Sequence, residues 1–202
     1  LAIRNSTIHN CQGNALGVVN SNVFVENCQL TNTLGNCLSV DGGNVTVNSS
    51  TIAQFYPLDA LRASALGFSG YAHPLVSFKM TNSIVTGYSD DEMMGLKPAV
   101  GSENAFNYDF ANCIIRTPEV EDKEKAHYTD VVFEDVKDTV SYGYKHFLLV
   151  DANMQLYDFH LRKESAAIDK ANVQTSTKHD HDGHERGDKP DVGAYEYTTN
   201  KE

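Results

Sequence analysis

One short pattern recurs five times within residues 1–118, and its period limits the folds that this chain can adopt. Each copy is centred on an Asn or a Ser, here called the anchor, and the first three anchors are 22 residues apart. The anchors are Asn5, Asn27, Ser49, Asn82 and Asn112. A fixed period of this length indicates a stack of similar supersecondary units rather than an ordinary globular domain.

Each copy predicts two strands joined at the anchor. Apolar residues stand four and two positions before the anchor, a small residue one position after it and an aliphatic residue three positions after it. Strand side chains alternate between faces, so the inward set changes parity at the anchor and the backbone must bend there. Asn tolerates the left-handed conformation of such a bend, and stacked Asn side chains are expected to form a ladder of amide hydrogen bonds. We expect a buried column of Val25, Val47, Met80 and Phe110.

A third strand follows in the first two copies, over residues 15–18 and 37–40, and a Gly-Asn turn introduces each of them. Three short strands in 22 residues make one coil of a parallel β-helix, and helical periodicity is absent. The sequence therefore predicts an all-β solenoid. A leucine-rich repeat is the structural alternative, but its leucine spacing and its helix are missing.

Four segments near the C-terminus form a second pattern: Asp158–Leu161, Ser165–Asp169, Asp180–Arg186 and Asp191–Glu196. They resemble the end of secreted bacterial β-helix proteins with a choice-of-anchor Q domain, although Ala166 stands where that family usually has Pro. The coils themselves resemble the right-handed, single-stranded parallel β-helix of pectate-lyase-like proteins. The resemblance implies this fold and an exported protein, but it implies no single activity.

The chain is expected to divide into coils and a cap. Residues 1–118 should hold the coils, and residues 119–202 an exposed excursion, the final strands and a C-terminal capping region of the same solenoid. Arg186 and Asp191 should pair and pin the terminal loop across the end of the stack, where Val192, Tyr195 and Tyr197 close the core. Because Leu1 begins in mid-coil, we expect further N-terminal coils in the same protein.

Composition limits the partners. A net charge of −11 argues against nucleic acid and against anionic membrane surfaces. No apolar run is long enough for a transmembrane segment. We expect a polysaccharide or a cell-surface glycan as partner, and a secreted, periplasmic or cell-surface location. The four cysteines should be reduced, because Cys28 and Cys113 occupy the same inward position three coils apart.

Two insertions interrupt the period. The spacing grows to 33 residues between Ser49 and Asn82 and to 30 between Asn82 and Asn112. Extra residues in a solenoid emerge as loops, here near residues 53–77 and 86–106. Being one coil apart, these loops should lie side by side on one flank.

In pectate-lyase-like enzymes a flank of this kind binds an acidic glycan. Carboxylates hold Ca²⁺ there, and an Arg or Lys removes the proton α to the uronate carboxyl. The resemblance implies candidate catalytic residues Arg62, Lys97 and His73, substrate-binding residues Asp59, Tyr71 and Tyr88, and Ca²⁺ ligands Asp90, Asp91 and Glu92. The alternative is that all of them are solvated loop residues.

Two functions stay open. The first is a non-catalytic glycan-binding or display segment of an exported cell-envelope protein. The second is a polysaccharide lyase, or less readily a glycoside hydrolase, with its site on the inserted flank. A hydrolase needs two carboxylates about 5–10 Å apart across a groove, and no spacing rule supports the candidate pair of Asp59 with Asp90 or Asp91. The first function is favoured, because no tight catalytic constellation stands out.

Overall fold

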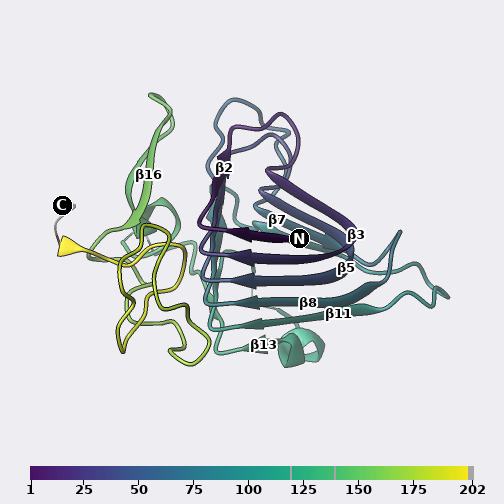
Figure 1. Cartoon of the computed structure of the whole chain (residues 1–202). Coiled ribbons are helices and arrows are strands. Elements are labelled where there is room, and N and C mark those ends of the chain that lie inside the picture. The colour runs from purple at the N-terminus through teal and green to yellow at the C-terminus, as the bar shows by residue number, and fades with distance from the viewer. Residues whose placement is uncertain (119, 139, 200–202) are drawn as a thin grey trace.

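Parallel strands stacked coil on coil confirm the predicted β-helix (Figure 1). The computed structural model describes residues 1–118, 120–138 and 140–199. Strands in this range form two parallel sheets and one antiparallel hairpin. The larger sheet contains β1 (Ala2–Arg4), β3 (Leu16–Glu26), β5 (Leu38–Asn48), β7 (Leu66–Ser69), β8 (Leu75–Thr81), β10 (Met93–Leu96), β11 (Phe106–Ala111) and β13 (Tyr128–Thr129). The smaller contains β2 (Thr7–His9), β4 (Gln29–Thr31), β6 (Thr51–Gln54), β9 (Ile84–Gly87), β12 (Ile114–Ile115) and β14 (Val132–Phe133).

Each full coil presents three faces. The first face consists of residues 16–19, residues 38–41, β7 and β10. The second face consists of β1, the later halves of β3 and β5, and β8, β11 and β13. The smaller sheet is the third face. Asn20 at φ 41° and Gly42 at φ 76° mark the bend between the first and second faces.

The bends at the anchors occur where the sequence predicts them. All five anchors have positive φ, between 46° and 52°. Strand register aligns Val25, Val47, Met80 and Phe110 in one column, and each is at most 1% exposed. The left-handed conformation therefore turns the chain once per coil and keeps the apolar positions directed inward.

The small residue after each anchor has a specific role. In all five copies its hydroxyl or thiol donates a hydrogen bond to the carbonyl two positions earlier, across the bend. The Oγ atoms of Ser50 and Ser83 also accept a backbone N–H from the neighbouring coil, from Cys28 and Ser50 respectively, at 3.1 Å each. Position +1 therefore needs a short donor as well as a small volume.

The predicted amide ladder is not the arrangement observed for Asn27 and Asn82. Their side chains bond instead to residues 172–196, here called the C-terminal strap. Asn27 Nδ2 donates to the carbonyl of His179 at 2.8 Å, and Asn82 Oδ1 accepts the N–H of Asn172 at 2.9 Å. These two anchors therefore serve as docking points for the strap.

The sequence suggested a loop for each insertion, but each insertion also contains a strand. Each contains the missing third strand of its coil, β7 in residues 53–77 and β10 in residues 86–106, and the two pair in parallel. They are hard to detect because β10 reads Met-Met-Gly-Leu and no Gly-Asn turn precedes either strand.

Residues 120–138 are also more ordered than an exposed excursion. After the 3₁₀ helix η1 (Asp122–His127), β13 and β14 flank Asp130, which has φ 51° and acts as a sixth anchor. Tyr128 continues the inward column below Phe110. Asp in place of Asn and a spacing of 18 residues hide this coil in the sequence.

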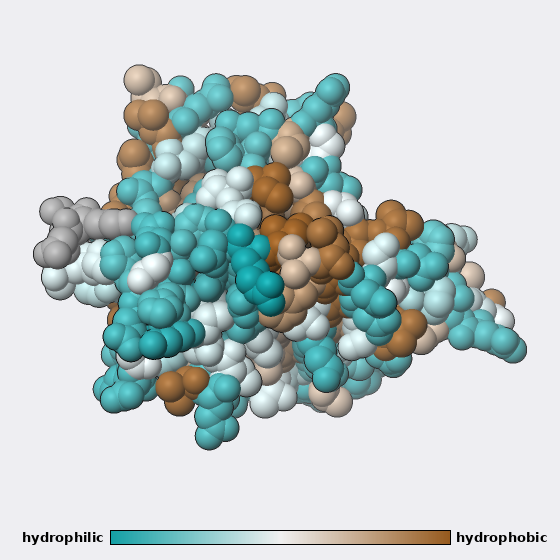
Figure 2. Space-filling view, viewed as in Figure 1, coloured by the Kyte–Doolittle hydropathy of each residue, from teal (hydrophilic) through white to brown (hydrophobic). Residues whose placement is uncertain are grey.

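The remaining C-terminal region covers the side of the stack rather than its end (Figure 1). It begins with the 3₁₀ helix η2 (Gly143–His146) and the hairpin of β15 (Phe147–Asp151) and β16 (Leu156–Leu161). A second core forms between this region and the outer side of the third face, from Ala53, Phe55, Ile84, Ile114, Phe147, Phe159, Leu161, Ala167, Val192, Ala194 and Tyr195. This core turns the apolar side of the region towards the coils, and the surface of the region that is visible in Figure 2 is largely hydrophilic.

The prediction that Val192, Tyr195 and Tyr197 close the end of the stack is therefore wrong. These residues instead cover the third face, where Ile84 and Ile114 point away from the interior of the coils. Tyr195 packs not on the last coil but near the first ones, and its hydroxyl donates to Gln29 Oε1 at 2.7 Å.

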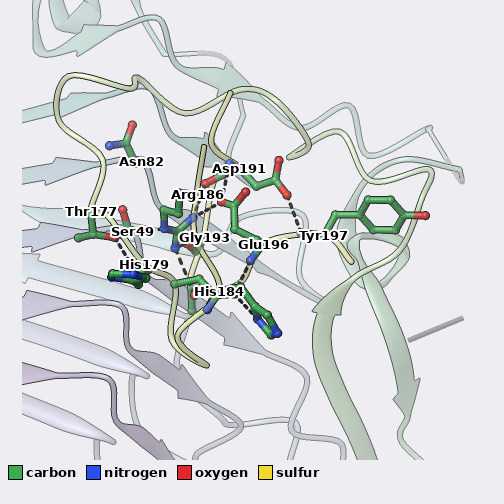
Figure 3. A network of polar contacts seen from close by, with 12 residues as sticks. Ser49, Asn82, Thr177, His179, His184, Arg186, Asp191, Gly193, Glu196 and Tyr197 are labelled. Atoms are coloured by element: carbon green, nitrogen blue, oxygen red, sulfur yellow. Dashed lines mark hydrogen bonds and ion pairs between the residues drawn. The ribbon is translucent and has the colours of Figure 1, made fainter. Parts of the chain in front are cut away.

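Arg186 does pair with a carboxylate, that of Glu196 rather than that of Asp191, within a larger network (Figure 3). Arg186 is 2% exposed, and its Nη1 donates to Glu196 Oε1 at 2.6 Å and to the carbonyl of Asp191 at 2.9 Å. Its other donors reach Thr177 Oγ1, Asn27 Oδ1 and the carbonyls of Gly193 and Ala194. The carboxylate of Asp191 accepts the N–H groups of Asp169 and Tyr197. The guanidinium of Arg186 thus joins separate parts of the strap to one another and joins the strap to the second coil.

Candidate functional site

The outer side of the first face forms a shallow groove. Its floor and walls are Asn36, Ser39, Val40, Asp41, Gly67, Phe68, Ser69, Met94 and Leu96, around a volume of about 170 Å³. Register places Ser39 beside Gly67 and Asp41 beside Ser69, so the floor is made of small side chains. Met94 and Leu96, at one end, are 68% and 54% exposed.

One edge of the groove carries a His–Asp pair. His73 Nδ1 lies 3.1 Å from Asp41 Oδ2, and the two side chains are 38% and 31% exposed. The second carboxylate oxygen, Asp41 Oδ1, is buried and has no hydrogen-bond partner among the described residues. A bond at Nδ1 leaves Nε2 as the ring atom that can act on a ligand. Gly42 permits this approach, because a Cβ there would lie 2.5 Å from the Cβ of His73.

The opposite edge carries a polar ladder. Asn14 Oδ1 accepts the N–H of Asn36 at 2.9 Å, and Asn36 Nδ2 donates to the carbonyl of Ser64 at 2.9 Å. Gly67 must lack a side chain here, because a Cβ would lie 2.9 Å from Asn36 Oδ1. The groove therefore has amide groups along one edge and a carboxylate with an imidazole along the other.

The nine predicted site residues do not share one flank. Parallel strands run in one direction, so segments before β7 and β10 lie at one edge of the first face and segments after them at the other. The first edge receives Asp59, Arg62, Tyr88, Asp90, Asp91 and Glu92, and the second receives Tyr71, His73 and Lys97. The insertions are side by side as predicted, but the first face separates their two halves.

Arg62 and the buried Glu92 form an ion pair at the first edge. Glu92 Oε1 accepts the N–H of Ser89 at 2.8 Å and Oε2 that of Ala65 at 2.9 Å. Arg62 Nη2 lies 3.8 Å from Glu92 Oε1 and donates to Ser89 Oγ at 3.1 Å. Burial raises the pKa of Glu92 to about 7, against the opposing effects of the N–H donors and of Arg62. Both oxygens of Glu92 therefore serve the loop backbone.

The other predicted ligands also have separate partners. Asp59 accepts the N–H of Leu61, Asp91 accepts the hydroxyl of Thr117, and Lys97 pairs with Glu124 at 2.5 Å. Asp90 lies 3.6 Å from Arg116 Nη2. Across residues 1–118, 120–138 and 140–199, no group of three or more His, Cys, Asp or Glu side chains is placed to hold a metal ion.

Several contributors to the site and its surroundings were missed from the sequence. Asp41 stands 14 positions after its anchor, at the register of Val19 in the first coil, so the repeat itself could have placed it. Arg116 and Glu134 both stand four positions after an anchor, and they pair at 3.1 Å. The position of Glu134 in the repeat can be assigned only once Asp130 is recognised as the sixth anchor.

No protein-family model, curated protein or solved structure matches this chain. Among the described residues, no helix has the length and apolar character needed to cross a bilayer. The functional interpretation therefore depends on the geometry of the chain itself.

Proposed function

We propose that this chain is a glycan-binding segment of an exported cell-envelope β-helix protein, secreted, periplasmic or held at the cell surface. The observation that carries the proposal is the groove of the first face. It combines amide, hydroxyl and carboxylate groups with exposed aliphatic side chains, the mixture that suits sugar hydroxyls and sugar C–H faces. Its small floor lets an extended chain of sugars approach the backbone closely.

The exported location rests on the resemblance of the C-terminal motifs to those of secreted bacterial β-helix proteins. The two later motifs lie in the strap, which holds the coils together. This supports a display role for the C-terminal region, with recognition left to the first face.

The test is binding to a panel of neutral and acidic glycans, followed by affinity measurements on variants. Asp41→Ala should weaken binding at least tenfold, because the side chain of Asp41, 31% exposed, lines the groove and orients His73. Asp109→Ala, an exposed carboxylate on the second face, is the matched control. Absence of binding to every glycan, or equal affinity of Asp41→Ala and the parent chain, argues against the proposal.

The His73–Asp41 pair favours a second candidate, a polysaccharide lyase. His73, oriented by the carboxylate, could act as the base: its Nε2 would take the proton α to a uronate carboxyl as the bond to the 4-oxygen breaks. Arg62 and Lys97, the bases expected from resemblance, are engaged with Glu92 and Glu124. Absorbance of an unsaturated product from polyuronates, with added Ca²⁺, tests this. Its loss in His73→Ala but not in Arg62→Ala would support His73 as the base.

A further inference from the structure

A second groove lies beyond the first edge of the first face, at the carboxyl ends of the third-face strands. Two adjoining hollows make it, and Val136 lines both. The smaller, of about 160 Å³, is lined by Gly87, Tyr88, Arg116, Val136, Asp138, Tyr142, Gly143, Tyr144 and Lys145. The larger, of about 660 Å³, is lined by Asp90, Thr117, Pro118, Phe133, Glu134, Asp135 and Val136. We call the two together the tyrosine groove.

A saturated polar network forms the floor of the tyrosine groove. Glu134 Oε2 accepts hydrogen bonds from Thr86 Oγ1, Arg116 Nη1 and the N–H of Gly143, at 3.1 Å each. Its Oε1 lies 3.0 Å from Nε2 of the fully buried His146, and His146 Nδ1 lies 2.8 Å from Ser165 Oγ. A buried network with every member paired is rigid. Arg116 therefore pairs with Glu134 inside the network, and its Nη2 also lies 3.6 Å from the more exposed Asp90.

The charges left to face a ligand are mostly negative. The side chain of Asp90 is 81% exposed, and Asp135 is also exposed. The N–H groups of Val140 and Ser141 hold the pKa of Asp138 below its usual value, so this carboxylate is ionised. The one lysine that lines the groove within the described residues, Lys145, has its Nζ 4.8 Å from the ring centroid of Tyr144.

Two tyrosines of the groove present ring surface. Tyr88 is 40% exposed and Tyr144 is 48% exposed. The ring of Tyr88 packs edge to face with that of Phe55, with 5.0 Å between the ring centroids. Exposed rings in fixed positions offer a flat surface to the C–H face of a sugar, and their π faces attract a cation.

We propose that the tyrosine groove binds saccharides that carry a protonated amine. The rings supply the stacking surface, and the carboxylates of Asp90, Asp135 and Asp138 supply the partners for the ammonium group. A uronate chain carries the opposite charge and meets three carboxylates here. This site is separate from the groove of the first face, so the two can be tested apart.

The experiment is calorimetric binding of three soluble tetrasaccharides of similar length to the full chain: β-1,4-glucosamine, its N-acetylated form and galacturonate. We expect the glucosamine tetramer to bind at least tenfold more tightly than the N-acetylated one at low salt, and this preference to shrink as ionic strength rises. The double variant Asp90→Asn/Asp135→Asn should remove most of the preference. Tyr144→Ala should weaken both tetramers. Asp109→Asn, an exposed carboxylate on the second face, is the control and should change neither affinity.

Three results would overturn this proposal: no binding of the glucosamine tetramer, equal affinity for the amine and N-acetyl forms, or tighter binding of galacturonate. Loss of amine binding in Asp41→Ala with retention in Asp90→Asn/Asp135→Asn would also overturn it, because the ligand would then lie on the first face. Chemical-shift changes of tyrosine ring protons on titration report the site directly, so a fold defect in one variant does not decide the outcome.

Discussion

Removing the guanidinium of Arg186 should unlock the C-terminal strap. In Arg186→Ala the carboxylate of Glu196, 12% exposed, loses its ion pair, and the carbonyls of Asp191, Gly193 and Ala194 lose a donor. Breaking a buried pair by removal of one partner costs about 3–5 kcal/mol, because the other charge stays buried. For a chain of this size each kcal/mol lowers Tm by about 2–4 °C, so Tm should fall by roughly 6–20 °C.

The assay is thermal unfolding followed by far-ultraviolet circular dichroism, together with amide exchange of strap residues. Arg4→Ala is the matched control, because Arg4 forms an exposed pair with Glu26 and is 58% exposed. Such pairs contribute about 1 kcal/mol or less. Arg186→Lys should fall between the two, since it keeps the charge but loses the fork of donors. If Arg186→Ala melts within about 2 °C of Arg4→Ala, the strap does not depend on this network and the reasoning is refuted.

Three further outcomes are expected. The pKa of Glu92 is about 7 in the folded state, above the ordinary value of 4.5, so the folded state binds more protons than the unfolded state between these pH values, and the free energy of unfolding should fall by up to about 3 kcal/mol as pH rises from 4.5 to 7. Urea unfolding should show a weaker dependence of this free energy on pH in Glu92→Gln than in the parent chain, and equal dependence contradicts the prediction. Alkylation under non-reducing conditions followed by mass spectrometry should find four free thiols, with Cys11 modified first since the other three are buried, whereas any disulfide would show that the coil register is wrong. Ser83→Ala should destabilise the chain by about 1–3 kcal/mol in denaturant titrations, because the N–H of Ser50 loses its acceptor; Ser77→Ala is the control, and equal stability of the two variants would refute the role of position +1.

The coils were predictable because one residue in each has a conformational requirement that few side chains meet. Positive φ at the anchor selects Asn, and the alternation around it records which residues point inward. The same register also held the signal that was overlooked. Ile84 and Ile114 stand two positions after their anchors, on the outer side of the third face, and an outward apolar residue requires a cover. The pattern shows that a cover is needed, but not which segment supplies it.

The candidate site was less predictable for a different reason. Residues of one insertion are close in sequence, yet β7 carries His73 to the edge opposite Arg62. A loop prediction without the strand inside it puts both on one side. Asp41, which orients His73, comes from a different coil, and only the three-dimensional stack brings the two within 3.1 Å.

The strap also bears on how the chain folds. Contacts between neighbouring coils join residues about 22–33 positions apart, whereas Arg186 meets Asn27 across 159 positions and Ala194 meets Thr51 across 143. Stacked repeats can ordinarily fray one unit at a time, because each contacts only its neighbours. Here the strap contacts each of the first four coils, so separating any of them requires the strap to detach. Docking of residues 172–196 onto the coils joins residues that are far apart in sequence, so its entropic cost makes it a slow step of folding. Once the strap is docked, the coils that it contacts should unfold and refold as one cooperative unit.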